Sequence, residues 1–521
     1  MRKLLLAVAL LVTLLLPTAC GWFGGDEDKL TVLAGSELSD LEPLFDQITR
    51  NTGVELEMQY IGTLDGAEKL LSGEAVDLAW FSHSKYLTLL QSAQGQTMTQ
   101  EKIMLSPVIL GVKTSKAQAW GWVDNPAVTW RDIAAKANDG ELHFAMTNPA
   151  SSNSGFTALV GVAAAFSGSS DALEVDNIDK EGLTAFFKGQ SLTAGSSGWL
   201  SESYVREQAR LDGMINYESV LLALNDGGQL DEPLYLVYPK EGIITADYPL
   251  MLINNEKREQ YDKLVEYLRT PDFQTELMER TLRRPVTPGV ALSAKFPTQL
   301  LVELPFPNNT EVIDRLLFGF LDEQRVPAHA IFVLDISGSM EGERLEQLKA
   351  SLRNLTGGDQ SLTGQFARFR NRERITMIPF SSEVHDTRLF TIDDTASEGQ
   401  SMEEVRAYVD SLTIQGGTAI YSALQQAYAV GEEAKRQDPT RYYSIVLMSD
   451  GENNEGISDN DFERFYQALP AEAQQIPTFT ILFGDAAEGE MVTLAELTGG
   501  RMFDAQSEGL SLIFKQIRGY Q

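Results

Sequence analysis

The last third of the chain alternates short apolar runs with longer segments of helical spacing. The apolar runs are residues 330–334, 375–380, 445–448 and 478–483. The segments that repeat apolar residues every three or four positions are 344–355, 419–435 and 461–469. Strands buried on both faces of a parallel sheet have continuous apolar runs, so this order predicts a doubly wound α/β domain. We expect its binding site beyond the carboxyl ends of the strands.

The first half of the chain shows the same alternation of strand and helix patterns. Residues 30–34 have the pattern of a strand that ends in a turn of small residues at Ser36. Residues 41–48 have helical spacing, residues 54–60 are typical of a second strand, and a further helix opens at Thr63. This half is therefore predicted to be a second α/β unit.

The N-terminus has the pattern of an export signal. Arg2 and Lys3 precede the apolar stretch 4–16, and small residues lead to Cys20, the only cysteine of the chain. The apolar core is too short to span a bilayer comfortably. Residues 16–20 resemble a bacterial lipobox, except that Pro17 stands where an aliphatic residue is usual. The resemblance implies a lipid on Cys20 and an anchor on the outer face of the cytoplasmic membrane; an ordinary cleaved signal and an uncleaved anchor are the alternatives.

Composition and missing motifs narrow the classes of function. The chain has 42 Lys and Arg against 74 Asp and Glu, a net charge of −32. A field of this sign repels nucleic acid and anionic head groups, so we expect neither as a partner. The four histidines lack metal-ligand spacing, and no His-Glu-x-x-His motif, phosphate loop or nucleophile elbow occurs in the sequence. We therefore expect a binding protein and not an enzyme.

Three polar loops carry the candidate chemistry of the last third. Asp335-Ile336-Ser337-Gly338-Ser339 and Ser449-Asp450-Gly451 each follow a predicted strand, and Gly416-Gly417-Thr418 opens a predicted helix. Carboxylate and hydroxyl oxygens suit a hard cation, although small polar residues at such turns also cap helices. In this order and spacing the three loops resemble the metal-ion-dependent adhesion site of the von Willebrand factor A (VWA) family, over residues 328–521.

This resemblance implies a ligand set for one divalent ion. Ser337, Ser339 and Thr418 would offer hydroxyl oxygens, and Asp335 and Asp450 would bind the ion directly or through water. The ion is expected to be Mg²⁺, with Mn²⁺ or Ca²⁺ as alternatives, and a carboxylate from a protein partner would complete its coordination. A VWA domain that keeps these loops for folding and binds no metal is the competing interpretation.

Residues 30–300 resemble type 2 periplasmic solute-binding proteins, most closely the group that includes the molybdate receptors. The resemblance rests on the strand and turn patterns above and on segments 106–112, 147–155 and 215–219. It implies two lobes that close by hinge motion on an oxyanion or a small organic solute. The carried-over ligand residues are Ser36, Thr63, Ser154 and Tyr217. Helix capping explains the hydroxyl residues of this set equally well.

The predicted organisation is a signal at 1–20, a tether at 21–29, a two-lobed receptor-like domain at 30–300, a linker with an apolar helix at 301–327 and a Rossmann-like VWA domain at 328–521. We interpret the protein as an exported, membrane-tethered binding protein, in the periplasm or at the cell surface, that couples a solute receptor to metal-dependent protein binding. One alternative is a receptor that delivers solute to a membrane importer and uses the VWA domain for docking. Another is an adhesive or assembly protein whose receptor half binds nothing.

Overall fold

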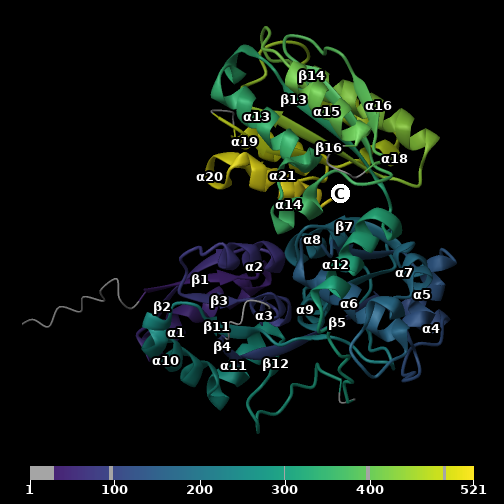
Figure 1. Ribbon diagram of the computed structural model, residues 1–521. Coiled ribbons are helices and arrows are strands. Elements are labelled where there is room, and N and C mark those ends of the chain that lie inside the picture. The colour runs from purple at the N-terminus through teal and green to yellow at the C-terminus, as the bar shows by residue number, and fades with distance from the viewer. Residues whose placement is uncertain (1–28, 93–97, 298–299, 395–398, 485–487) are drawn as a thin grey trace, which may run out of the picture.

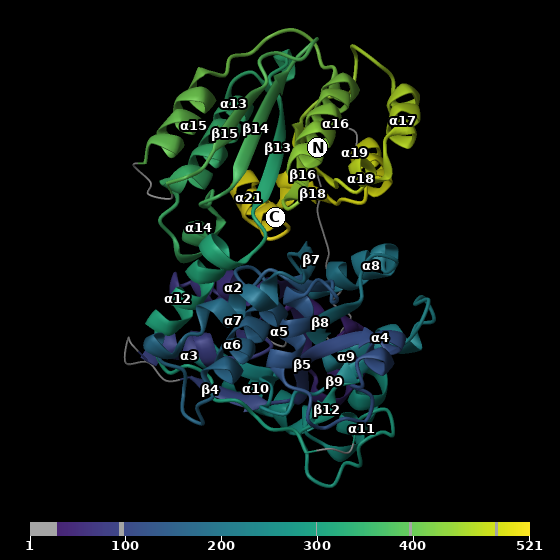
Figure 2. The same cartoon turned by 90° about the vertical axis from the view of Figure 1, so that its right-hand side faces the viewer.

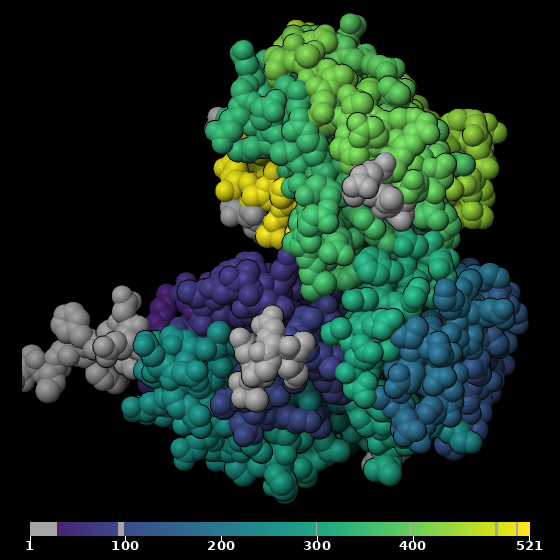
Figure 3. Space-filling view, in the orientation of Figure 1, coloured from purple at the N-terminus to yellow at the C-terminus, as the bar shows by residue number. Residues whose placement is uncertain are grey.

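The computed structural model describes residues 29–92, 98–297, 300–394, 399–484 and 488–521, which form two domains stacked end to end (Figure 1). The predicted signal and Cys20 lie outside these residues. Within the described ranges, no helix has the length and apolarity needed to cross a membrane. Figure 3 shows a waist between the domains, where the purple first lobe and the yellow C-terminal helices face each other.

Lobe 1 of the N-terminal domain is built on a five-stranded sheet of order β2-β1-β3-β11-β4. Strands β1 to β3 are parallel, and β11 runs antiparallel to both of its neighbours. The strands are β1 (Lys29–Ala34), β2 (Glu55–Tyr60), β3 (Leu78–Trp80), β4 (Thr99–Lys102) and β11 (Pro249–Leu252). The helices are α1 (Phe45–Thr52), α2 (Thr63–Leu71), α3 (Lys85–Ser92), α10 (Arg258–Leu268) and α11 (Pro271–Thr281), with the 3-10 helix η2 (Ser36–Leu44).

Lobe 2 contains a mixed sheet of order β10-β5-β8-β6-β7, with β9 and β12 also paired to β5. The strands are β5 (Met104–Lys113), β6 (Phe144–Thr147), β7 (Gln190–Ala194), β8 (Gly213–Tyr217), β9 (Leu234–Val237), β10 (Thr245–Ala246) and β12 (Arg284–Pro285). The helices are α4 (Thr114–Ala119), α5 (Trp130–Asn138), α6 (Asn153–Ser167), α7 (Lys180–Phe187), α8 (Ser197–Glu207) and α9 (Glu218–Asp226). Helix α6 is the central element, because all of its residues except Ser167 are buried.

The two lobes are packed directly against each other. The ring of Tyr86 in lobe 1 lies 5.7 Å from that of Phe156 on α6, centroid to centroid. His83 Nε2 lies 3.0 Å from the hydroxyl of Thr157, also on α6. The chain crosses between the sheets beside Tyr248, a non-glycine residue with a φ of 37°. The two lobes are therefore closed on each other in this structure.

The linker runs along both lobes before it enters the C-terminal domain. Ile243 exchanges backbone hydrogen bonds with Val302 and Leu304. The ring of Phe306 lies 5.6 Å from that of His83 and 6.1 Å from that of Phe156. Helix α12 (Thr310–Gly319) then contacts α3 of lobe 1 and α6 of lobe 2. The apolar face of the predicted linker helix is buried against the receptor, as its sequence requires.

The C-terminal domain is doubly wound around a six-stranded sheet of order β15-β14-β13-β16-β17-β18. Only the edge strand β15 is antiparallel in this sheet. The strands are β13 (Ala328–Asp335), β14 (Arg374–Phe380), β15 (Arg388–Thr391), β16 (Tyr442–Ser449), β17 (Thr478–Leu482) and β18 (Met502–Asp504). The helices are α13 (Glu343–Arg353), α14 (Leu362–Ala367), α15 (Gln400–Ser411), α16 (Ile420–Gln437), α17 (Asp459–Ala468), α18 (Ala471–Gln474), α19 (Glu488–Leu497), α20 (Ala505–Glu508) and α21 (Leu510–Arg518). The predicted fold class, a two-lobed receptor fold followed by a doubly wound domain, is confirmed.

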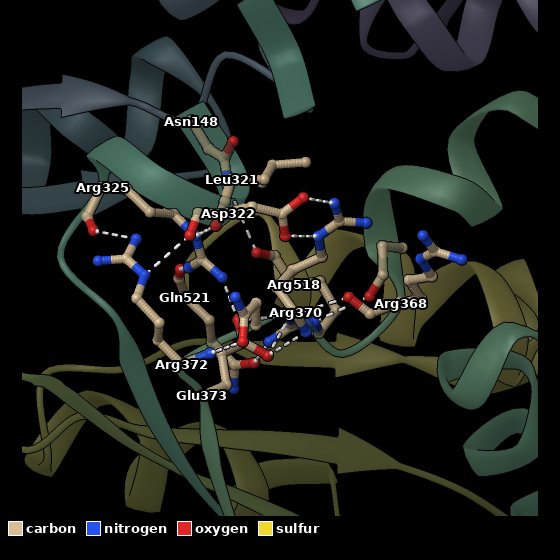
Figure 4. Close-up of polar contacts among 12 residues, drawn as sticks. Asn148, Leu321, Asp322, Arg325, Arg368, Arg370, Arg372, Glu373, Arg518 and Gln521 are labelled. Carbon is tan, nitrogen blue, oxygen red and sulfur yellow. Dashed lines mark hydrogen bonds and ion pairs between the residues drawn. The ribbon is translucent and has the colours of Figure 1, made fainter. Parts of the chain in front are cut away.

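A buried ionic network joins the linker to the C-terminal domain (Figure 4). Both carboxylate oxygens of Glu373 accept hydrogen bonds from Arg518 Nη2 at 2.8 Å, and Arg325 forms a second ion pair with the same carboxylate. Arg370 of the C-terminal domain forms an ion pair with Asp322 of the linker. Glu373 and Arg518 lie in the C-terminal domain and Arg325 in the linker, so the network fixes the two segments relative to each other.

Candidate metal centre and solute cleft

The carboxylate of Asp335 is held rigidly at the end of β13. Its side chain is fully buried, Oδ1 accepts a hydrogen bond from the backbone N–H of Ser337 at 2.8 Å, and Oδ2 accepts one from the hydroxyl of Ser449 at 2.5 Å. Strand β13 lies between β14 and β16, so Asp335 reaches the carboxyl edge at the centre of the sheet. This is the position at which open α/β sheets bind ligands.

Two serine hydroxyls connect this loop with the loop after β16. The Oγ atoms of Ser337 and Ser339 are 3.0 Å apart, and Ser339 Oγ donates to Asp450 Oδ1 at 2.7 Å. Asp450 is also buried, with 2% of its surface exposed. The structure therefore places Asp335, Ser337, Ser339 and Asp450 in one chain of polar contacts.

Thr418 reaches the same place from the third loop. Its N–H donates to Asn454 Oδ1 at 2.8 Å, which fixes the loop before α16. A Cβ built on Gly451 would lie 3.4 Å from Ser339 Oγ and 3.5 Å from Thr418 Oγ1. The glycine thus leaves open a small space that both hydroxyls border. All five residues predicted from the sequence come together at this edge of the sheet.

The charges of the centre suit a dication. Burial raises the pKa of the Asp335 carboxyl and the charge of Asp450 raises it further, against the hydrogen bonds from Ser337 and Ser449, which lower it. Arg344 of α13 forms an ion pair with Asp450. Two carboxylates and three hydroxyls are a donor set that Mg²⁺ accepts. Across the part of the chain that the structure describes, no cluster of three or more His, Cys, Asp or Glu side chains is arranged to hold a metal.

The cleft between the lobes contains charged residues that the sequence interpretation did not include. The hydroxyl of Tyr217 donates to Glu37 Oε1 at 3.4 Å across the cleft. Arg283, fully buried, donates from Nη2 to the carbonyl of Glu37 at 2.8 Å and from Nη1 to Asp40 Oδ2 at 2.5 Å. Its guanidinium lies 5.0 Å from the ring centre of Tyr248. Glu37 therefore links the predicted ligand residue Tyr217 to a buried arginine.

Unsatisfied polar atoms gather around this cleft. The N–H of Thr63 donates to Asn153 Oδ1 of the other lobe at 2.9 Å, while the buried Oγ1 of Thr63 has no hydrogen-bond partner. The buried atoms Ser82 Oγ, Tyr248 OH and Arg283 Nε also lack partners. Buried polar groups normally have partners, so these atoms offer a polar solute several hydrogen bonds.

The remaining two predicted ligand residues lie elsewhere. Ser36 is exposed at the rim of a cavity of about 750 Å³ at the mouth of the cleft. Ser154 Oγ lies 2.8 Å from Thr147 Oγ1 and 2.7 Å from Ser197 Oγ, so its hydroxyl is used inside lobe 2. Its neighbour Asn153, like Phe156 and Thr157 of the same helix, contacts lobe 1. Thr63 and Tyr217 thus each bond a residue of the opposite lobe, whereas Ser154 does not.

The C-terminal domain covers the mouth of the cleft and contacts both lobes. Glu68 Oε2 of lobe 1 accepts hydrogen bonds from Thr363 N at 3.0 Å and from Thr363 Oγ1 at 2.5 Å. The ring of Tyr520 packs edge-on against Trp199 of lobe 2, with centroids 4.8 Å apart. Figure 2 shows α14 and the chain end above α2, β7 and α8. The cavity of about 750 Å³ therefore has walls from both lobes and, through Lys515 and Tyr520, from the C-terminal domain.

Comparison with known proteins identifies both domains. Residues 30–280 match the family described as bacterial extracellular solute-binding protein, and residues 330–516 match the von Willebrand factor type A domain. The protein therefore consists of a bacterial extracellular solute-binding domain followed by a VWA domain. The extracellular class of the first domain indicates an exported protein.

Individual relatives are similar to a part of the chain. A stretch of 134 residues is 29% identical to inter-alpha-trypsin inhibitor heavy chain H4 of Sus scrofa, covering 25% of this chain and 13% of that protein. Heavy chain H3 of Homo sapiens is 29% identical over 158 residues, 29% of this chain and 16% of that protein. The chain thus spans less than a fifth of the length of these relatives.

Among solved structures, periplasmic binding proteins match a little over half of the chain. The periplasmic binding protein AfuA from Actinobacillus pleuropneumoniae, with fructose-6-phosphate bound, has 13% identity and a TM-score of 0.45, and the match covers 57% of this chain and 98% of that one. The ferric binding protein from Campylobacter jejuni has 11% identity and a TM-score of 0.42, covering 56% and 96%.

Proposed function

We propose that this is an exported, membrane-tethered, non-enzymatic binding protein in which the solute-binding domain controls metal-dependent protein binding by the VWA domain. The observation that carries the proposal is the contact of the VWA domain with both lobes at the mouth of the cleft, through Thr363 and Tyr520. A hinge motion that separates the lobes must break one of these contacts. Solute binding and VWA docking are then linked, and the linkage is reciprocal.

The VWA half of the proposal rests on the donor set of the metal centre. Ser337, Ser339 and Thr418 would hold Mg²⁺ by their hydroxyls, and Asp335 and Asp450 would bind it directly or through water. The bound ion would supply a Lewis-acidic position for a carboxylate of the protein partner. Asp335 and Asp450 are buried and oriented by their serine neighbours, which prepares the site for the ion.

The receptor half suits a small polar solute. Arg283 pairs with Asp40 and donates to the carbonyl of Glu37, and burial raises the pKa of both the Glu37 and the Asp40 carboxyl. The unpartnered hydroxyls of Thr63, Ser82 and Tyr248 suit a small organic solute with several polar groups.

Distance measurements across the lobes test the coupling. Spin labels at Ala135→Cys on α5 and Glu266→Cys on α10, both exposed positions, report lobe separation in a chain that carries Cys20→Ser. We expect the Tyr520→Ala variant, which loses the ring packed on Trp199, to give a longer and broader distance distribution than the parent. Gln467→Ala on the exposed face of α17 is the control. Identical distributions in parent and Tyr520→Ala would disprove the coupling.

A further inference from the structure

A second interdomain cavity, of about 310 Å³, lies between lobe 2, the linker and the VWA domain. It is separate from the metal centre and lies outside the solute cleft. Lys188 and Arg210 reach it from lobe 2, Arg325 from the linker, and Lys435 and Arg441 from the VWA domain. Its size is within the range of cavities that hold small molecules.

The charge of this cavity is opposite to that of the whole protein. Five cationic side chains line it, and none of its lining residues is Asp or Glu. The chain as a whole has a net charge of −32, so a cavity lined by five cations and by no Asp or Glu is not typical of its surface. A concave site of one charge sign concentrates counter-ions of the other sign.

Two of these cations have no acidic partner. Arg210, Arg325 and Arg441 pair with Glu207, Glu373 and Asp438. In contrast, Lys188 Nζ donates to the amide oxygen of Asn138 at 2.8 Å, and Lys435 Nζ donates to the carbonyl of Glu472 at 2.8 Å. Among the residues that the structure describes, neither lysine has a carboxylate within 4.0 Å. One unbalanced ammonium therefore comes from each domain.

The carboxylates that act on Lys435 do not line the cavity. Burial and the positive charge of Arg210 lower the pKa of Lys435, whereas the charges of Glu472 and Glu207, which lie outside the cavity lining, raise it. Behind the cavity wall, Glu373 is already shared by Arg325 and Arg518, as Figure 4 shows. Two cations share one carboxylate there, and Arg325 Nη1 also donates to the backbone oxygen of Gln521, so Glu373 is not available to the two lysines.

Gln190 offers a hydrogen-bond acceptor to a ligand. It lines the cavity, and its Nε2 donates to Met146 O at 3.2 Å and to Thr193 Oγ1 at 3.1 Å. Its Oε1 is buried and has no partner. This atom can only accept a hydrogen bond, so a ligand that carries a hydroxyl in addition to its negative charge would satisfy it.

We infer that this cavity binds a small multivalent anion that also carries a hydroxyl group, of the hydrogen phosphate or hydroxycarboxylate class. The anion would bridge Lys188 of the solute-binding domain and Lys435 of the VWA domain. Charge-assisted hydrogen bonds to both ammonium groups would hold the domains in the observed arrangement. The inference goes beyond the proposed function, because it uses neither the metal nor the cleft solute.

Calorimetric titration of the mature chain with inorganic phosphate, citrate and sulfate tests the inference. The protein is first stripped of metal with EDTA and then dialysed free of it, and the titrations are run at constant ionic strength, so that metal binding contributes nothing. We expect one site for phosphate and for citrate and weaker binding of sulfate, which has no hydroxyl at neutral pH. Absence of binding by both phosphate and citrate would overturn the inference, and equal binding of sulfate would overturn the assigned role of Gln190.

Paired variants locate the site. The Lys188→Gln/Lys435→Gln variant loses two charge-assisted donors, and its affinity should fall about 100-fold or more. The Lys263→Gln/Lys295→Gln variant loses two exposed lysines of the receptor and should bind like the parent. Equal losses of affinity in both double variants would show that only the overall charge matters, and would overturn the proposed site. Without anions, Lys435→Gln should melt close to the parent, because the variant loses the repulsion from Arg210 together with the attraction of Glu472 and Glu207; a much lower melting temperature would indicate a structural role instead.

Discussion

The candidate metal centre and the solute cleft are assembled in opposite ways. The candidate metal centre draws its five predicted ligand residues from three short loops at one edge of one sheet, where Asp335 ends β13 and Asp450 follows the adjacent β16. The cleft takes Glu37 and Thr63 from lobe 1, Asn153 and Tyr217 from lobe 2, and Arg283 from the return between them. The first site is local to a fold element, whereas the second depends on how two lobes and a further domain are placed.

This difference determines which site can be recognised from a motif. A parallel sheet brings the ends of neighbouring strands together whatever the rest of the chain does, so short sequence patterns are enough. A cleft between lobes is defined by contacts over long sequence separations. Its chemistry therefore depends on the placement of residues such as Arg283, for which no local pattern exists.

The largest expected effect is at Glu373, in the ionic network that joins the linker to the VWA domain. Glu373→Gln would leave the buried guanidinium groups of Arg325 and Arg518 without their carboxylate, which should cost about 3–5 kcal/mol of unfolding free energy at pH 7. Chemical denaturation measures it. Glu323→Gln, an exposed linker residue paired with Lys180, is the matched control and should change little.

The pH dependence of the same variant sharpens this prediction. Burial raises the pKa of Glu373, but the charges of Arg518 and Arg325 outweigh burial and hold its pKa below the ordinary value of 4.5. Its stabilisation is therefore present above pH 4.5 and lost as the pH falls through the lower folded pKa. The difference between parent and Glu373→Gln should shrink in acid. A constant difference would show that Glu373 is not ionised in the fold.

The next effect isolates the metal centre. Mg²⁺ at 100 times its dissociation constant should stabilise the parent by about 2.7 kcal/mol, and Asp335→Ala should abolish this increment. Thermal unfolding with and without Mg²⁺ measures both. Glu463→Ala, which removes an exposed carboxylate from α17, should keep the full increment. Stabilisation of Asp335→Ala by Mg²⁺ would place the metal elsewhere.

A smaller effect is expected where the VWA domain contacts lobe 1. Thr363→Val removes the hydroxyl that donates to Glu68 and should cost about 1.5 kcal/mol, because hydrogen bonds to charged groups are stronger than neutral ones. Urea unfolding gives the cost, and the spin-label pair shows whether the lobes separate. A stability loss without lobe separation would mean that this contact does not restrain the cleft.

The smallest expected effect separates two predicted ligand residues. Ser154→Ala loses hydrogen bonds inside lobe 2 and should cost about 1 kcal/mol of stability without changing affinity for a solute identified by screening. Thr63→Val should weaken that affinity and leave stability nearly unchanged, because its hydroxyl has no partner. The reverse pattern would restore Ser154 as the ligand residue.

The alternation of strand and helix predicted the fold class of both domains, and the polar loops after the strands predicted which residues meet at the metal centre. The residues of the cleft were predicted less well. A hydroxyl residue at the start of a helix can be a cap or a ligand, and the sequence pattern is the same in both cases. Ser154 and Asn153 are neighbours at the start of α6, and only the packing of α6 decides which one faces the other lobe. Arg283 is a charged residue among polar ones in the sequence, and its complete burial follows from tertiary contacts alone.

The linker also determines how the molecule would respond to mechanical load. Val302 and Leu304 are bonded to Ile243, close to the strands that cross between the lobes, and Phe306 lies beside a ring of each lobe. A pull on the VWA domain would first load α12, which contacts both lobes, and only then this segment. Tension would therefore act on both lobes together before it reached the strands that cross between them.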